Sequence, residues 1–118
     1  MTSLVTCLGS GNGSWVPVLE LIDGSSWDAV FLIMPAFFAD KFQPQHTNIT
    51  KIIIEDTQSV ETIEQQLIKE FDGKLFGDTA VDLTSGGGRE HMAILSAMLK
   101  TGCGIRLVHS VNGMPCEL

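Results

Sequence analysis

Two glycine-rich stretches hold the residues best suited to bind a ligand. They are LGSGNGS, residues 8–14, and TSGGGRE, residues 84–90. Glycine lets a ligand approach the main chain closely, and successive N–H groups in such turns form a concavity that attracts anions. Serine and threonine hydroxyls in both stretches are further donors, and Arg89 adds a charge that can contact a phosphate through two hydrogen bonds. The residue types therefore favour a small ligand that carries phosphate.

Short apolar runs flank these stretches and have the length and β-branched content of strands. They are residues 3–8, 29–34, 51–54, 79–83 and 104–109. Because the runs are apolar throughout rather than alternating, we expect every one of these strands to be buried on both faces.

Two helices are expected between the first four strands. The first runs over residues 14–22, with Ser14 as its N-terminal cap. The second is the clearest in the sequence and spans residues 60–71, where apolar side chains recur at helical spacing. Ser59 is its predicted cap, and Gly73 is predicted to end it.

A further helix is expected to follow the second glycine-rich stretch. It starts near Arg89 and ends at Gly102. The spacing of Met92, Leu95 and Leu99 predicts that these three side chains face the core.

Strands that alternate with helices are typical of a parallel sheet covered on both sides. The sequence therefore predicts one α/β domain over residues 1–118, a Rossmann-like three-layer sandwich with a mainly parallel five-stranded sheet in the order 3-2-1-4-5. In that order the first and fourth strands are neighbours, and ligands bind beyond the C-terminal ends of strands at such a switch point. The two glycine-rich stretches follow these two strands.

The charge balance narrows the class of ligand. The chain carries seven basic and fourteen acidic side chains, for a net charge of −7. Long nucleic acids are bound mainly through cationic contacts to phosphates, so we expect no such partner. A small ligand held by main-chain N–H groups and one or two cations remains compatible with this charge.

The location is predicted to be cytoplasmic. The first residues lack the basic segment of a signal peptide, and the longest apolar run, residues 29–39, is far shorter than the roughly 20 residues that cross a bilayer. A fragment of a longer, membrane-tethered protein is the alternative. The three cysteines and three histidines have no metal-ligand spacing, so we expect no metal and no cofactor.

Two common phosphate-binding motifs fit the sequence poorly. The dinucleotide fingerprint G-x-G-x-x-G would need glycine at position 14, where the chain has serine, and an acidic residue after the second strand, where it has Met34 and Pro35. A P-loop needs a Gly-Lys-Ser/Thr ending, which neither stretch has.

The chain instead resembles the CARF domains, the CRISPR-associated Rossmann folds, over most of its length. The first strand runs into a Gly/Ser turn, here TCLGSGNGS. The fourth ends in a pattern similar to D-L-T-G-G-T-K-x-M, here DLTSGGGR over residues 82–89, with Met92 beyond. Ser85 stands at the usual first glycine, and Arg89 stands about where a lysine is usual.

This resemblance implies a two-fold homodimer that binds a cyclic oligoadenylate across its interface, with cyclic tetra-adenylate as the expected ring. It implies a sensor domain of type III CRISPR antiviral signalling or, almost equally, a stand-alone ring nuclease that cleaves the messenger without metal through attack by a ribose 2′-hydroxyl. The nine residues after the fifth predicted strand are too few for an effector domain. The chain is then either free-standing or separated from an effector or a membrane segment.

The candidate site residues are those of the two stretches and the end of the second strand. The expected ligand-binding residues are Gly9, Ser10, Gly11, Asn12, Met34, Pro35, Thr84, Ser85, Gly86, Gly87, Gly88 and Arg89. Arg89, Ser10 and Thr84 are the candidates to stabilise the phosphate during cleavage.

The roles of several further residues near these stretches remain open. Phe37, Phe38 and Phe42 could stack on an adenine or belong to the core, and His91 could face the ligand or solvent. Asp82 is expected to be structural. The rival functions are a small Rossmann enzyme that uses a nucleotide such as NAD or S-adenosylmethionine, and a structural subunit without a ligand.

Overall fold

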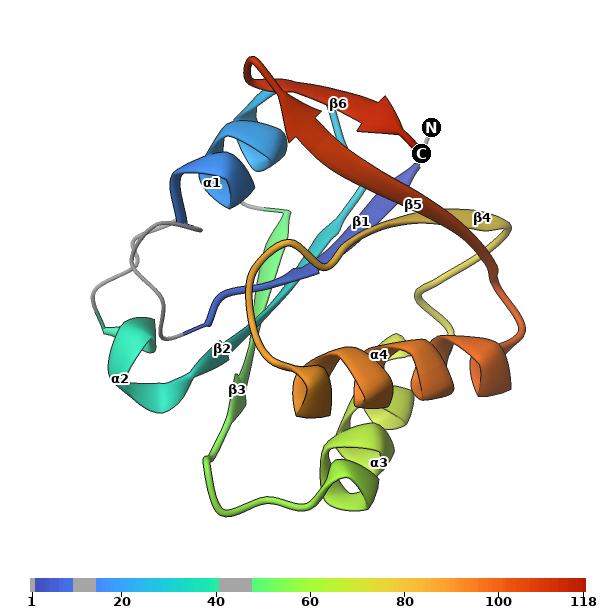
Figure 1. The fold of residues 1–118 in the computed structure, drawn as a ribbon. Helices are drawn as coiled ribbons and strands as arrows, with labels where there is room; N and C mark the ends of the chain where they lie inside the picture. Colours follow the sequence, from blue (N-terminus) through green and yellow to red (C-terminus); the bar gives the residue numbers. More distant parts are fainter. Residues whose placement is uncertain (1, 10–14, 41–47) are drawn as a thin grey trace.

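A mixed six-stranded sheet organises the chain, and the computed structural model describes residues 2–9, 15–40 and 48–118 of it (Figure 1). In these residues the strands are β1 (Ser3–Cys7), β2 (Val30–Pro35), β3 (Ile49–Ile54), β4 (Asp78–Asp82), β5 (Gly104–Val111) and β6 (Met114–Glu117). Their spatial order is β3-β2-β1-β4-β5-β6, with every pair parallel except β5 and β6. The predicted order of the first five strands is therefore confirmed, in an α/β arrangement compatible with a Rossmann-like fold.

The prediction of only five strands is wrong, because the last residues form β6. The chain reverses at Asn112 and Gly113, which both have positive φ angles, 53° and 80°. Such a two-residue turn matches the right-handed twist of two antiparallel strands. Val111 pairs with Met114 across the turn, and β6 becomes one edge of the sheet.

The described helices are α1 (Trp15–Asp23), α2 (Ala36–Ala39), α3 (Val60–Phe71) and α4 (Gly88–Thr101). Figure 1 shows α1 over one face of the sheet and α3 with α4 over the other. The predicted cap of α3 is confirmed, since the Ser59 hydroxyl accepts a hydrogen bond from the Thr62 amide. The cap proposed at Ser14 lies outside the described residues. None of the helices in the described ranges is long and apolar enough to cross a membrane.

The core lies in two layers, one on each face of the sheet. Val5 and Cys7 of β1 pack with α3 and α4, whereas Leu4 of the same strand packs with α1. The alternation of side chains along a strand sends neighbours to opposite layers. The central strands β1, β2 and β4 are buried almost throughout, as the apolar runs predict.

The outer strands β3 and β5 are more exposed than predicted. Ile53 of β3 is 42% exposed, and β5 has no fully buried residue. β3 is an edge strand, and β5 is followed in the sheet only by the four-residue β6, so an apolar run does not by itself ensure burial there.

The prediction that Met92 and Leu99 face the core is also wrong. These side chains are 64% and 71% exposed, and Leu95 is half-buried. The core face of α4 is formed by Ala93, Ile94, Ala97 and Met98. Both sets have helical spacing. The face with two alanines is the one that meets the sheet, because small side chains allow close approach.

A polar contact between α3 and α4 fixes the position of the site-bearing helix. Glu64 of α3 accepts hydrogen bonds from Ser96 and Lys100 of α4, the latter at 3.0 Å. The hydrogen bonds from Ser96 and then Lys100 hold the pKa of Glu64 below its usual value. Glu64 is therefore ionised at neutral pH, and the ionised carboxylate accepts hydrogen bonds from both Ser96 and Lys100.

Candidate functional site

The two glycine-rich loops meet directly at the C-terminal ends of β1 and β4. The Gly9 amide donates a hydrogen bond of 2.8 Å to the Ser85 hydroxyl. A Cβ atom at Gly9 would lie 2.6 Å from the main chain of Gly86, and one at Gly86 would lie 2.7 Å from Cys7 Sγ. Such contacts are shorter than side chains allow. Glycine at positions 9 and 86 therefore permits the closest approach of the two loops.

Asp82 orders the start of the second loop. Its side chain is 1% exposed and accepts hydrogen bonds from the amide and hydroxyl of Thr84 and, at 3.3 Å, from Thr6 of β1. Side chains of this type commonly stabilise a turn by bonding to the main chain two residues on. This placement supports the structural role that we expect for Asp82.

Cys7 of β1 and His91 of α4 both contact the loop that follows β4. The Cys7 thiol donates to the carbonyl oxygen of Ser85 at 2.8 Å, and His91 Nε2 lies 2.7 Å from the same oxygen. A carbonyl only accepts, so Nε2 is the protonated nitrogen of the ring. Burial, with smaller effects from the Asp82 and Glu90 carboxylates, raises the pKa of Cys7 to about 12. The thiol is therefore a hydrogen-bond donor and not a nucleophile at neutral pH.

The N-terminus of α4 carries a carboxylate of its own. Glu90 Oε2 accepts a hydrogen bond of 2.7 Å from the Gly87 amide, in the first turn of the helix. The positive end of the helix dipole favours a negative group at this position. The place where a ligand phosphate would be held is thus filled by Glu90.

Arg89 lies beside Glu90 and reaches towards the loop after β3. Its Nη1 donates to the carbonyl oxygens of Asp56 and Gln58, and its Nε and Nη2 lie 3.3 Å from Glu90 Oε1. The side chain is 32% exposed. Arg89 therefore connects α4 to the loop after β3, next to the glycine turn rather than over it.

A pocket of about 320 Å³ opens beyond the ends of the four strands β1 to β4. It is lined by Leu8, Gly9, Pro35, Phe37, Ile54, Asp56, Thr84, Ser85, Gly86, Gly87 and Glu90. A larger hollow of about 470 Å³ lies where β2 and β3 begin, between residues 22–27 and Asn48, away from both glycine loops. The smaller pocket is the one at the switch point of the strand order.

The predicted site residues are brought together in part. Gly9, Pro35 and residues 84–87 line the pocket, whereas Gly88 and Arg89 do not appear among its lining residues. Met34 differs from the prediction, because it is fully buried among the residues that pack with α1. The alternation along β2 turns Met34 to that layer. Ser10, Gly11 and Asn12 lie outside the described residues.

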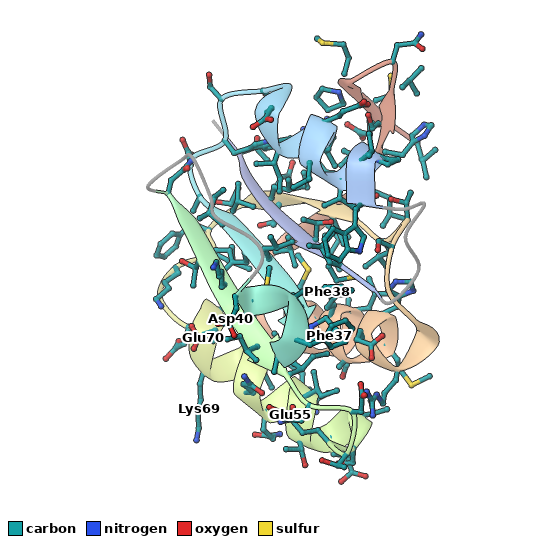
Figure 2. All side chains as sticks on the ribbon, turned by 90° about the vertical axis from the view of Figure 1, so that its left-hand side faces the viewer. Phe37, Phe38, Asp40, Glu55, Lys69 and Glu70 are labelled. Atoms are coloured by element: carbon teal, nitrogen blue, oxygen red, sulfur yellow. The ribbon has the colours of Figure 1, made fainter. Side chains whose placement is uncertain are left out.

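The two described phenylalanines of α2 have different surroundings. Phe38 is buried and its ring packs edge-to-face against Trp15, with 4.1 Å between centroids. Phe37 is 53% exposed and lines the pocket. Figure 2 shows both phenylalanines on α2. Phe37 is therefore the ring available for stacking, and Phe42 lies outside the described residues.

Several residues at the site were not among the sequence candidates, and the apolar ones that line the pocket are Leu8 and Ile54. Trp15 Nε1 donates to the carbonyl oxygen of Gly9 at 3.0 Å, and Asp56 and Glu90 line the pocket. The signal for Glu90 is present in the sequence, since a glutamate three residues after a helix cap commonly bonds back to it. No comparable local pattern marks Trp15 or Asp56.

Comparisons of the chain with protein-family models, with curated proteins and with solved structures give no match.

Proposed function

We propose that the chain binds a cyclic oligoadenylate, with cyclic tetra-adenylate as the preferred ring, at a homodimer of Rossmann-like CARF domains. The observation that carries the proposal is the contact between the two glycine-rich loops. The Gly9 amide meets the Ser85 hydroxyl at the switch point, and the pocket opens beside this contact. The pattern DLTSGGGR, which resembles the CARF motif, forms the second of these loops.

The lining of the pocket supports a ligand that carries both bases and phosphates. Phe37 offers an aromatic face for a base, and Asp56 offers a carboxylate that can accept hydrogen bonds from an exocyclic amino group. The phosphate would lie at the first turn of α4, where it replaces the Glu90 carboxylate at the Gly87 amide and turns Arg89 towards itself.

Binding is favoured over cleavage as the role of this site. His91, the nearest candidate for proton transfer, has Nε2 directed to the Ser85 carbonyl oxygen. Arg89 is held by carbonyl groups and Glu90. The residues nearest the glycine turn are therefore arranged to position the loop, which fits a sensor better than a ring nuclease.

The test is a thermal melt of the chain with different nucleotides. A ligand at about 100 times its dissociation constant adds about 2.7 kcal/mol, which raises the Tm of a domain of this size by on the order of 10 °C. We expect this shift with cyclic tetra-adenylate and none with NAD or S-adenosylmethionine. A shift with NAD alone would establish the dinucleotide rival instead.

A further inference from the structure

The larger hollow, where β2 and β3 begin, has no role in the proposed function. Its volume of about 470 Å³ is within the range of small-molecule sites. Residues that precede β2 and β3 line it, so it lies at the opposite end of these strands from the glycine loops. The polar and aromatic side chains of its lining are those of Asp23, Ser25, Ser26, Trp27 and Asn48.

Trp27 is held in place through both its side chain and its main chain. Its Nε1 donates a hydrogen bond of 3.0 Å to the carbonyl oxygen of Leu21, in the last turn of α1. Its own carbonyl oxygen accepts a hydrogen bond of 2.7 Å from Asn48 Nδ2. The side chain is partly buried against the core layer that contains α1. A ligand that contacts a ring already held in position loses less free energy to ordering.

The loop between α1 and Trp27 is packed against the tip of the β5–β6 hairpin. A Cβ atom at Gly24 would lie 2.3 Å from the carbonyl oxygen of Gly113, so glycine at position 24 lets the two main chains touch. Figure 1 shows the hairpin turn beside α1, and both strands of the hairpin are in contact with that helix. The wall of the hollow that carries Ser25 and Ser26 is therefore supported by the rest of the fold.

The charge around the hollow is negative. Residues 1–40 contain no lysine, arginine or histidine, and Asp23 is the charged residue among the described lining residues. Asp23 ends α1, so its carboxylate adds to the partial negative charge at the C-terminus of the helix. Arg106 lies with Trp27 at a separate hollow of about 220 Å³, where it pairs with Glu117 at 2.6 Å. The larger hollow therefore favours a cation over a phosphate or another anion.

The polar atoms of the lining are suited to accept hydrogen bonds. The Asp23 carboxylate only accepts, and Asn48 directs its Nδ2 to Trp27 and keeps Oδ1 as an acceptor. The hydroxyls of Ser25 and Ser26 can accept as well as donate. A primary ammonium group is the complement of this lining, because it has three N–H donors and no acceptor. The face of an indole ring also attracts a cation.

We propose that the larger hollow binds a linear primary amine, with its ammonium group between the Asp23 carboxylate and the indole of Trp27. A neutral sugar can also stack on a tryptophan, but it gains nothing from the negative charge around the hollow. The amine site is independent of the site proposed for the cyclic oligoadenylate, since the two lie at opposite ends of β2 and β3.

The test is a titration of the wild type with putrescine, a four-carbon diamine, followed by NMR of the two indole N–H signals. Trp27 lines the hollow, whereas Trp15 Nε1 donates to the carbonyl oxygen of Gly9 in the first glycine loop. We expect the Trp27 signal to shift saturably, with a Kd on the order of 1 mM, and the Trp15 signal to stay in place. Cyclic tetra-adenylate should instead leave the Trp27 signal unchanged, so the two sites are judged separately.

Variants with a matched control locate the ammonium group. Asp23→Asn keeps the size of the side chain and removes its charge, so the affinity for putrescine should fall about tenfold. Asp28→Asn removes the same charge next to Trp27 but outside the lining, and should change the Kd less than about twofold at about 0.15 M salt. Trp27→Leu, measured by calorimetry and checked for folding by circular dichroism, should weaken binding about fivefold.

Neutral and inorganic probes complete the test. Butanediol, glucose and Mg²⁺ at the same concentrations should leave the Trp27 signal in place. A Trp27 signal that does not move with putrescine, or that moves as much with the diol or the sugar, would overturn the proposal. Equal losses of affinity in Asp23→Asn and Asp28→Asn would also overturn it. Displacement of putrescine by an equal concentration of Mg²⁺ would show general attraction of cations and contradict a site for amines.

Discussion

Gly9→Ala is expected to lower the free energy of unfolding by about 1–3 kcal/mol, the usual cost of an added methyl group in a fully packed place. The new Cβ would lie 2.6 Å from the Cα and N atoms of Gly86. Main chain cannot move aside as a flexible side chain can. The two loops would separate, the hydrogen bond from the Gly9 amide to Ser85 would lengthen, and cyclic tetra-adenylate binding should be lost with it.

Gly88→Ala is the matched control for this change. No atom lies within 4 Å of a Cβ at Gly88, which begins α4. Alanine is preferred to glycine in a helix, so stability should stay equal or rise by about 0.5–1 kcal/mol. Urea denaturation of the three proteins gives the comparison. If Gly9→Ala is as stable as the wild type, the two loops do not depend on their close approach.

Substitutions at Arg89 and Glu90 are expected to change ligand affinity in opposite directions. Arg89→Ala removes the cation and should weaken binding of cyclic tetra-adenylate by about 1.5–3 kcal/mol for each contact. Two copies present two such arginines to one ring, so the total loss should be larger. Glu90→Gln removes the negative charge that occupies the first turn of α4, keeps an oxygen for the Gly87 amide, and should tighten binding by about 1 kcal/mol, roughly fivefold.

Controls separate the role of Arg89 in binding from its role in the fold. Arg89 also bonds to the carbonyl of Gln58, so Arg89→Ala should lower stability as well as affinity. Arg89→Lys keeps the positive charge but loses the bidentate contact. Its affinity for cyclic tetra-adenylate should therefore lie between those of the wild type and Arg89→Ala. Titrations are therefore made below the melting range of each variant. Full affinity in Arg89→Ala, or weaker binding in Glu90→Gln, would place the phosphate away from the first turn of α4.

The sequence predicts most of the fold because hydrophobic runs and local stop signals agree. The central strands, α3 with its Ser59 cap and the end of α4 at Gly102 follow from periodicity and capping alone. The sixth strand could also have been predicted, since Asn112-Gly113 between apolar residues is a strong local signal for a hairpin. The segment is only four residues long and contains Pro115, and both features argue against a strand when the sequence is taken alone.

The orientation of α4 was not predictable from its periodicity. Met92, Leu95 and Leu99 form a stripe as regular as that of the residues that are buried. Which stripe meets the sheet depends on the space left by neighbouring elements, and alanines fit the narrower gap. A surface helix with two apolar stripes can bury only one of them against the sheet, and Met92 and Leu99 stay exposed.

The candidate site is predictable only where it lies on the main chain. Glycine positions and strand order locate the meeting of the two loops. The direction of a long side chain depends on contacts distant in sequence. Arg89 is held by carbonyl groups more than thirty residues away, at Asp56 and Gln58. No local pattern predicts such partners.

The central claim, that two copies of the chain share one cyclic oligoadenylate, is tested most directly by calorimetric titration of the wild type with cyclic tetra-adenylate. We predict saturable binding at one ring for every two chains, with NAD giving no heat under the same conditions. Chromatography of the ligand afterwards should recover the ring intact, as expected of a sensor. One ring bound to each chain, or no binding at any concentration of ring, would contradict the claim.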